Sequence, residues 1–307
     1  MRARQMSFLV LLALLVVTGF VGWDSGNTAR PTTLEAQQSP TAPLVPLPNR
    51  AGSFKFGVLG DFGTGSREQY QLAEQMVTLH GRFKYELVAL VGDNLYGSER
   101  PQDFRKKFEV PYRPLLDAGV KFYASLGNHD AREQRFYKLF NMEGKLYYTF
   151  NPTADVRFFA LETTYPTPEQ IKWLETELQA SSNNWKIVFF HHPLYSSGDR
   201  HGSDISLREV LEPLFVKYNV SVVLNGHDHF YERVKPQKGI TYFVVGSGGK
   251  LRVGNIDQKS GITAKGFDTD LAFMAAEISG DEMYFNAISR RGETVDSGTL
   301  TRRTVTP

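Results

Sequence analysis

The chain of 307 residues contains no cysteine. This absence excludes disulfide bonds, zinc–thiolate sites, iron–sulfur clusters and thiol nucleophiles. Any bound metal must therefore be held by nitrogen and oxygen ligands. Any stability that the protein needs outside the cell must come from packing.

The sequence also has no marked excess of charge of either sign. Its 35 lysine and arginine residues nearly balance its 33 acidic residues, which gives a formal net charge of +2. Nucleic-acid-binding domains and polybasic membrane patches show a clustered excess of basic residues. We therefore expect no nucleic-acid partner.

The N-terminus carries the longest uncharged apolar run, from Ser7 to Trp23, shortly after Arg2 and Arg4. A basic start followed by such a run is typical of an export signal, with an uncleaved membrane anchor or a buried core helix as alternatives. Residues 24–52 are rich in Pro, Thr, Ser and Gln, which predicts a disordered linker. We therefore expect a signal peptide or anchor at 1–23 and an exported protein that is periplasmic, secreted or membrane-anchored facing outside.

From Phe54 onward, one pattern recurs along the chain. Short runs rich in Val, Leu and Phe, of a length that suits buried strands, each end in a polar residue that can bind a metal. The polar residues at these ends are Asp61, Asp93, Asn128, His191 with His192, and His227. Ligands of parallel sheets gather at the carboxyl ends of the strands, so we expect these side chains to lie together.

Helical stretches separate the strands and carry recognisable start signals. The pairs Ser66 with Gln69, Thr167 with Gln170, and Ser206 with Glu209 each fit a capping box. Alternating strands and helices predict parallel βαβ units, so the fold class is α/β. The later runs, such as "LAFMAAEIS" and "EMYFNAIS", predict strands of a second, mixed or antiparallel sheet packed on the first. We expect one catalytic domain at 53–300 and a short tail at 301–307.

The polar strand ends define a candidate metal centre. Its expected members are Asp61, Asp93, Tyr96, Asn128, His191, His227 and His229. Carboxylate and amide oxygens mixed with imidazoles suit Fe, Mn, Zn or Co. So many ligands exceed the need of one catalytic ion and suit two ions that share a bridging carboxylate, as in enzymes of phosphoryl displacement.

The motifs "GDFG", "GDNLY", "GNHD", "HHP" and "GHDH", in this order, resemble those of the calcineurin-like metallophosphoesterases. The tyrosine of "GDNLY", and Gly63 where other members have histidine, point to the purple acid phosphatases, in particular to the short type similar to tartrate-resistant acid phosphatase. The resemblance covers roughly residues 54–290. It implies a four-layer αββα sandwich of two mixed sheets flanked by helices.

The resemblance also implies a role for each ligand. Asp61, Tyr96 and His229 would bind ferric iron, with Asp93 as the bridge to the second metal. The second, divalent ion (Fe, Zn or Mn) would be bound by Asn128, His191 and His227. His192 replaces a tyrosine of the family, and because neighbouring strand residues face opposite ways, we expect only one histidine of this pair to reach the metal. A phenol with a pKa of about 10 is a poor ligand for most divalent ions, whereas Fe(III) binds it as phenolate.

The implied activity is that of an acid phosphatase, which hydrolyses small-molecule phosphate monoesters by in-line attack of a metal-bound hydroxide. His129 is the first candidate for protonating the leaving group, Asp130 is the candidate for orienting its imidazole, and His201 is the second candidate acid. Substrate choice is expected to lie in loops such as 96–112 and 195–206.

Two other functions remain open at this point. A phosphodiesterase or nucleotidase would use the same metal centre, although diesterases of the family usually have histidine in place of Gly63 and lack Tyr96. A non-catalytic surface binding protein would have no reason to keep every ligand. The stretch "GSGGK" (246–250) lacks the spacing of a phosphate-binding P-loop and predicts a turn after a strand, near the site.

Overall fold

The computed structural model describes residues 44–304. The predicted signal peptide or anchor at 1–23 and most of the predicted linker lie outside these residues, so both stay predictions. Within 44–304, no helix combines the length and the apolarity that a membrane crossing requires.

Two mixed sheets form the centre of the fold. The first has the strand order β13-β12-β11-β1-β2-β3, and the second has the order β10-β8-β9-β7-β6-β5-β4. The strands of the first sheet are β1 (Phe54–Leu59), β2 (Leu87–Val91), β3 (Lys121–Ser125), β11 (Ala272–Ser279), β12 (Glu282–Ser289) and β13 (Thr294–Thr301). The strands of the second sheet are β4 (Tyr148–Phe150), β5 (Val156–Ala160), β6 (Trp185–Phe189), β7 (Val222–Asn225), β8 (Tyr231–Val234), β9 (Thr241–Val245) and β10 (Thr263–Phe267).

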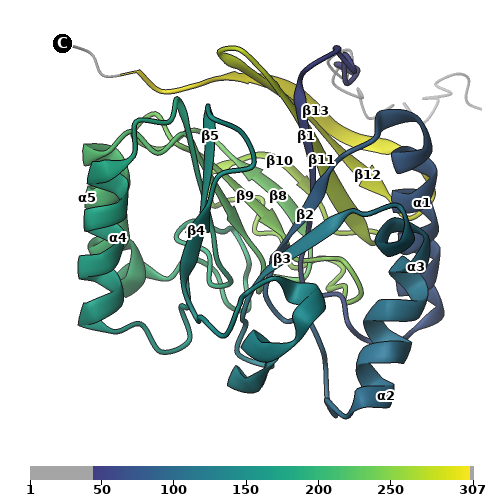
Figure 1. Cartoon of the computed structure of the whole chain (residues 1–307). Coiled ribbons are helices and arrows are strands. Elements are labelled where there is room, and N and C mark those ends of the chain that lie inside the picture. The colour runs from purple at the N-terminus through teal and green to yellow at the C-terminus, as the bar shows by residue number, and fades with distance from the viewer. Residues whose placement is uncertain (1–43, 305–307) are drawn as a thin grey trace, which may run out of the picture. The chain divides into compact units, whose positions relative to one another are not determined.

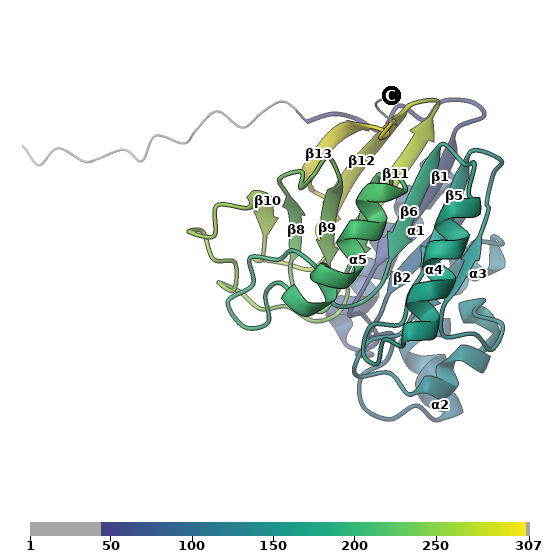
Figure 2. The ribbon, with the colours of Figure 1, turned by 90° about the vertical axis from the view of Figure 1, so that its left-hand side faces the viewer.

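Helices cover the outer face of each sheet. Figure 1 shows α1 (Arg67–Phe83), α2 (Pro101–Phe104) and α3 (Val110–Asp117) on one side, and α4 (Pro168–Ala180) and α5 (Ile205–Lys217) on the other. Figure 2, seen from the side of α4 and α5, shows these two helices lying over the second sheet. This is the predicted αββα arrangement.

Aromatic side chains fill the space between the sheets. Phe56 of β1 meets Phe158 of β5 with ring centroids 5.3 Å apart, and Phe243 of β9 meets Phe285 of β12 at 5.0 Å. Edge-to-face pairs of this kind add to the stabilisation that burial provides. The two sheets are therefore packed against each other through one apolar core.

The distribution of strands differs from the expectation. The predicted parallel units are divided between the sheets, because β1, β2 and β3 pair with one another while β6 and β7 belong to the second sheet. The late strand β11 pairs antiparallel with β1 and so extends the first sheet. Local sequence predicts a strand but not its partner, so the assignment of strands to sheets could not be made from periodicity.

Three helix starts test the predicted capping boxes. Ser66 accepts a hydrogen bond from the backbone N–H of Gln69 (3.2 Å), and Thr167 accepts one from that of Gln170 (3.3 Å), so both residues are N-caps as predicted. The reciprocal half of each capping box is not formed, because the two glutamine side chains bond elsewhere, to Gly65 and Lys107 and to Glu162. The third prediction is wrong. Helix α5 begins at Ile205 with Asp204 as N-cap, whose carboxylate accepts from Leu207 N–H (2.9 Å), so Ser206 lies inside the helix.

Two further boundaries differ from the expectation. Residues 96–112, expected as a loop, contain α2, the π-helical segment Arg105–Glu109 and the start of α3. Within the predicted linker, the backbone N–H groups of Asn49 and Arg50 donate to the buried carboxylate of Glu277 on β11 (2.6 Å each). The packed domain therefore begins before the predicted boundary at 53.

The corrected cap of α5 can be tested by substitution. Asp204→Ala should lower the free energy of unfolding by about 0.5–2 kcal/mol, because it leaves a helix N–H without its acceptor. Ser206→Ala should change it little, because Ser206 is exposed inside the helix. Urea denaturation followed by circular dichroism measures both free energies of unfolding. A larger loss of stability in Ser206→Ala than in Asp204→Ala would favour Ser206 as the N-cap, as first predicted.

Candidate metal centre

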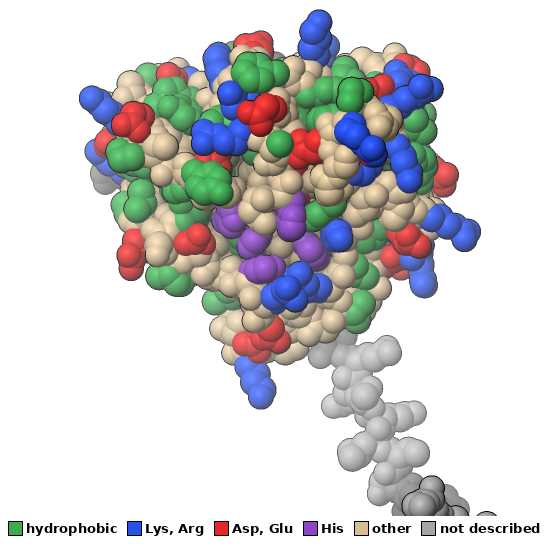
Figure 3. Space-filling view, turned by 90° about the horizontal axis from the view of Figure 1, so that it is seen from below, with side chains coloured by type: hydrophobic (Ala, Val, Ile, Leu, Met, Phe, Trp, Pro, Cys, Tyr) green, Lys and Arg blue, Asp and Glu red, His purple; other side chains and the backbone are tan. Residues whose placement is uncertain are grey.

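The predicted ligands converge at one edge of the two sheets. Asp61, Asp93 and Asn128 follow β1, β2 and β3 of the first sheet, while His191 and His227 follow β6 and β7 of the second. Seen from below, the molecule presents its histidines as one cluster in the middle of this face (Figure 3). The carboxyl ends of strands from both sheets thus build one site, as predicted.

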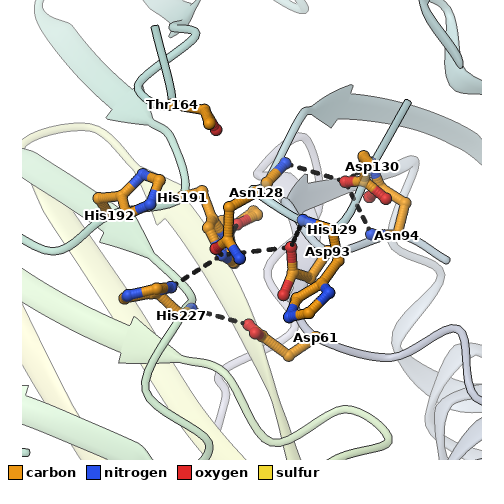
Figure 4. A network of polar contacts seen from close by, with 12 residues as sticks. Asp61, Asp93, Asn94, Asn128, His129, Asp130, Thr164, His191, His192 and His227 are labelled. Atoms are coloured by element: carbon orange, nitrogen blue, oxygen red, sulfur yellow. Dashed lines mark hydrogen bonds and ion pairs between the residues drawn. The ribbon is translucent and has the colours of Figure 1, made fainter. Parts of the chain in front are cut away.

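Three of these residues adopt a left-handed backbone conformation. The φ angles are 54° for Asp61, 50° for Asp93 and 71° for His227. Residues other than glycine adopt positive φ rarely, and such strain gathers at functional sites, where the surroundings over-determine the conformation. The strained turns direct these three side chains into a common space at the ends of the strands (Figure 4).

A first group of possible ligands consists of Asp61, Asp93 and His229, whose donor atoms lie within 4.8 Å of one another. The phenol oxygen of Tyr96 joins this group. It lies 3.1 Å from Asp61 Oδ1, 2.9 Å from Asp93 Oδ2 and 3.2 Å from His229 Nε2. The predicted ferric ligand set, with the predicted bridge, is therefore together in space.

A second group is centred on His191. Its Nε2 lies 3.1 Å from Asn128 Oδ1, 3.2 Å from His227 Nδ1 and 3.4 Å from Asp93 Oδ1. On the other side of the ring, Nδ1 lies 3.0 Å from the carbonyl oxygen of Val91, to which it can donate only as N–H. That contact leaves the Nε2 lone pair free to bind a metal, as second partners of metal-binding histidines generally do.

His192 lies in the same space, contrary to the expectation that only one histidine of the pair would approach it. One of its ring nitrogens is within 4.8 Å of nitrogens of His191 and His227. Its Nδ1 is 3.0 Å from the hydroxyl oxygen of Thr163. The strand β6 ends at Phe189, so the pair belongs to the following loop, where the alternation of strand side chains no longer applies.

The electrostatics of the site call for added positive charge. Asp61 and Asp93 are buried side by side, and within residues 44–304 their ion-pair partners are histidines alone. Burial raises the pKa of Asp61 well above its usual value, and Asp93 adds to the rise. Burial also raises the pKa of Tyr96, with further contributions from both carboxylates.

The imidazoles shift in the opposite direction. Burial lowers the pKa of His227 to about 2, helped by His191, and that of His229 to about 4, helped by the charge of Arg252. These histidines are therefore neutral and can donate lone pairs. Bound cations would favour the ionised form of the carboxylates and so offset the cost of burying their charge, because an ion is the largest local charge in such a site. The residues present thus fit a metal centre.

The buried charge of Asp61 gives a test on the metal-free protein. Its raised pKa means that the unfolded chain loses the proton first. The destabilisation is therefore absent below the unfolded pKa of about 4 and grows as the pH rises. In chelator, we expect Asp61→Asn to melt like wild type near pH 4 and a few degrees higher at pH 7.

The control for this test is Glu209→Gln, an exposed carboxylate on α5, which should melt like wild type throughout. Differential scanning calorimetry at both pH values measures the effect. With metal added, Asp61→Asn should melt at a lower temperature than wild type at pH 7, because the variant lacks one metal ligand. A variant that is less stable than wild type at pH 7 in chelator would contradict the assignment of buried negative charge.

The candidate acids border the two groups. The imidazole of His129 lies with its ring centroid 5.0 Å from that of Tyr96, and the ring of His201 lies 4.2 Å from that of His227. Both side chains are exposed, and the backbone N–H of His129 donates to Asp93 Oδ1 (3.0 Å). Their positions are compatible with proton transfer at the rim of the site.

The predicted role of Asp130 does not agree with the structure. Its carboxylate accepts from the backbone N–H groups of Asn94, Leu95 and Gly127 (2.9–3.0 Å) and from the side chains of Asn94 and Gln134. None of these contacts reaches the imidazole of His129. Asp130 instead ties the loop after β3 to the loop after β2, and the carboxylate is too fully engaged to orient a neighbour.

Sequence reasoning gave no role to several other residues at the site. Asn94 donates to Ser125 O (2.9 Å) and to Asp130, so it fastens the "GDNLY" loop. Its place within that motif was the one signal in the sequence that could have identified it. The "GSGGK" turn lies against the site as expected, because Lys250 N–H donates to Asp61 O (3.1 Å). Thr163 and Arg252 carried no motif that could have identified them.

Comparison with known families places the chain in one of them. The sequence model of the calcineurin-like phosphoesterase family matches residues 54–231, more than half of the chain. The chain therefore belongs to the calcineurin-like phosphoesterases.

The curated relatives of the chain include purple acid phosphatases and a tartrate-resistant acid phosphatase. Purple acid phosphatase 17 of Arabidopsis thaliana is 29% identical over 67% of this chain and 71% of its own length. Tartrate-resistant acid phosphatase type 5 of Homo sapiens is 24% identical over 82% of this chain and 92% of its own length. The predicted resemblance and the predicted class of phosphoric ester hydrolases are confirmed. With the two ligand groups, these relatives indicate a binuclear metal centre.

Solved structures agree on the fold. GAP50, described as the anchor in the inner membrane complex of Plasmodium, has a TM-score of 0.70 at 20% identity and covers 82% of this chain and 90% of its own. The purple acid phosphatase PPD1 from yellow lupin has a TM-score of 0.68 at 19% identity and covers 84% of this chain and 55% of its own. At such identities the likeness concerns the fold, and it confirms two mixed sheets flanked by helices.

Proposed function

We propose that the protein is an acid phosphatase that hydrolyses small-molecule phosphate monoesters at a centre of Fe(III) and one divalent ion. The observation that carries this proposal is the phenol oxygen of Tyr96 between the buried carboxylates of Asp61 and Asp93. A phenol placed there has little use toward most divalent ions, whereas ferric iron binds it as phenolate. The divalent ion would be Fe, Zn or Mn, bound by Asn128, His191 and His227.

The bound ions would offset the charge of the ester and supply an activated water. The chain's own residues position the two ligand groups and hold the proton for the leaving group. Asp93 lies against both ligand groups and so sets the spacing between them. His129 and His201 border the site and can hold a proton for the leaving oxygen. Both residues are exposed, and histidine side chains gather on the face of the molecule shown in Figure 3, where an ester would enter.

Gly63 argues for monoesters against the phosphodiesterase alternative. A Cβ atom at this position would lie 1.9 Å from the carbonyl oxygen of Asn94, so no side chain fits there in this arrangement of loops. Tyr96 N–H donates to Gly63 O (2.9 Å), which couples the glycine to the position of the phenol. The histidine that diesterases of the family usually carry here would displace the "GDNLY" loop.

A non-catalytic anchoring role is the second candidate, because the fold resembles that of GAP50. The retention of every expected ligand in one place opposes it. Phosphatase activity that is lost on chelation and restored by metal would exclude it. A protein that binds no metal would favour it.

The visible absorption spectrum tests the ferric site. The oxidised protein should show a phenolate-to-iron band that shifts on mild reduction, and Tyr96→Phe should lose this band. Tyr70→Phe, which removes a phenol from α1 that contacts only the carbonyl of Lys106, is the matched control and should keep it. A colourless protein active with Mn or Zn would contradict the ferric centre while leaving the phosphoesterase.

The proposed acids are tested by substitution. His129→Ala and His201→Ala should each lower kcat by roughly 10²–10⁴-fold while metal content stays unchanged, because each removes a proton donor and no ligand. His80→Ala, on α1 where the ring meets that of Tyr85 edge to face, should leave kcat unchanged. Elemental analysis of the same samples completes the test. Loss of metal in either active-site variant would make that residue a ligand or a structural residue.

A further inference from the structure

A cluster of basic side chains lies beside the metal centre and has no part in the function proposed above. The turn after β9 brings two of them there. Lys250 N–H donates to Asp61 O (3.1 Å), and Arg252 N–H donates to His229 O (3.0 Å). A Cβ atom at Gly249 would lie 2.1 Å from the carbonyl oxygen of Phe62, so only glycine allows this close approach. The backbone of the turn is thus fastened to two ligand-bearing loops.

A third basic residue, Arg200, comes from the loop that carries His201. This loop is held against the segment that follows Arg252. Asp199 N–H donates to Asn255 O (2.9 Å), and Asp257 N–H donates to Ser197 O (2.8 Å). Arg200 directly precedes His201, whose ring centroid lies 4.2 Å from that of His227, so this loop carries its positive charge to the rim of the metal centre.

The three cations have no carboxylate partner within ion-pair distance in the described part of the chain. Lys250 Nζ lies 4.6 Å from the centroid of the Tyr96 ring, and a guanidinium nitrogen of Arg252 is buried without a hydrogen-bond partner. Asp228 is the carboxylate whose charge acts most strongly on Arg252, although the two form no ion pair. Its Oδ2 accepts from Ser196 Oγ (2.6 Å) and Gly202 N–H (3.2 Å), and its Oδ1 has no hydrogen-bond partner. One carboxylate can offset at most one of the three positive charges, so the remaining positive charge favours the binding of an anion.

The metal ions would already neutralise Asp61 and Asp93, so these carboxylates do not explain the basic cluster. Figure 3 shows basic side chains directly beside the histidines on the open face. A substrate whose reacting phosphate faced the ligand groups would therefore extend past Tyr96 toward positive charge. Phosphate is the group that guanidinium and ammonium side chains bind best at such a place.

We propose that Lys250, Arg252 and Arg200 form an anion subsite that binds a second phosphate group of the substrate. The preferred substrates are then phosphate monoesters that carry another phosphate a short distance from the one removed. This inference rests on the proposed function and deepens it, because it assigns specificity to residues outside the metal centre.

The test compares fructose 1,6-bisphosphate with fructose 6-phosphate on the metal-loaded protein. Both carry primary phosphate esters, so they differ mainly in the second anionic group. We expect the KM of the bisphosphate to be about tenfold lower, which exceeds the factor of two from its two reactive groups. The double variant Lys250→Gln/Arg252→Gln should remove this difference and leave the KM of p-nitrophenyl phosphate within about twofold. An unchanged visible spectrum would show that the metal centre of the variant is intact.

Lys121→Gln is the matched control, since this exposed lysine begins β3 at the opposite edge of the sheet. It should behave as wild type toward all three esters. Thermal shift of the metal-loaded protein by each fructose phosphate measures binding independently of turnover. Equal binding of the two fructose phosphates would overturn the proposed subsite. An equal rise in KM for all three esters in the double variant would overturn it as well. Absence of p-nitrophenyl phosphate hydrolysis with preferential bisphosphate binding would overturn the acid phosphatase proposal alone.

Discussion

The burial of Asp61 and Asp93 side by side is the constraint on which this structure depends, because in the described part of the chain only histidines lie within ion-pair distance of them. An isolated buried carboxylate is strongly unfavourable in a protein interior, and two of them together are more so. Neutral imidazoles and a phenol surround the pair, and none of these supplies a positive charge. Protonation of a carboxyl group or binding of cations relieves this arrangement. Because the lone pairs of neutral histidines lie beside the carboxylates, the sheet edge fits a metal centre better than a packed core.

Holding such groups in place requires support from the loops behind them. Asp130 accepts three backbone N–H groups and thereby joins the loops that carry Asp93 and Asn128. On the other side, Glu232 accepts from the backbone N–H and hydroxyl of Ser197 and so fastens the loop of His201. Glu232 is buried and Asp130 is half-buried, and the oxygens of both carboxylates are engaged by neutral donors, which is how polar groups are tolerated in a protein interior. The left-handed turns at the ligands can persist because these networks over-determine the loops.

The sequence alone predicted the features that depend on local residues. The polar residues at the strand ends predicted the site, and Ser66 and Thr167 predicted the starts of two helices. The spacing within "GDNLY" predicted that Tyr96 lies beside Asp93. Features that depend on distant partners could not be predicted. The pairing of β11 with β1, the approach of His192 beyond the end of β6, and the engagement of Asp130 by neighbouring backbone are set by tertiary contacts. Arg252 belongs to the same class, because only the folded turn brings it to His229.

The contact between Gly63 and Asn94 links the identity of residue 63 to the position of Tyr96. The phenol reaches the carboxylates only if the "GDNLY" loop lies close to the turn after β1, and that closeness leaves no room for a side chain at position 63. A chain with histidine there would have to move the loop and with it the tyrosine. This explains why one glycine and one tyrosine, both outside the set of histidine and carboxylate ligands, carry so much of the functional assignment.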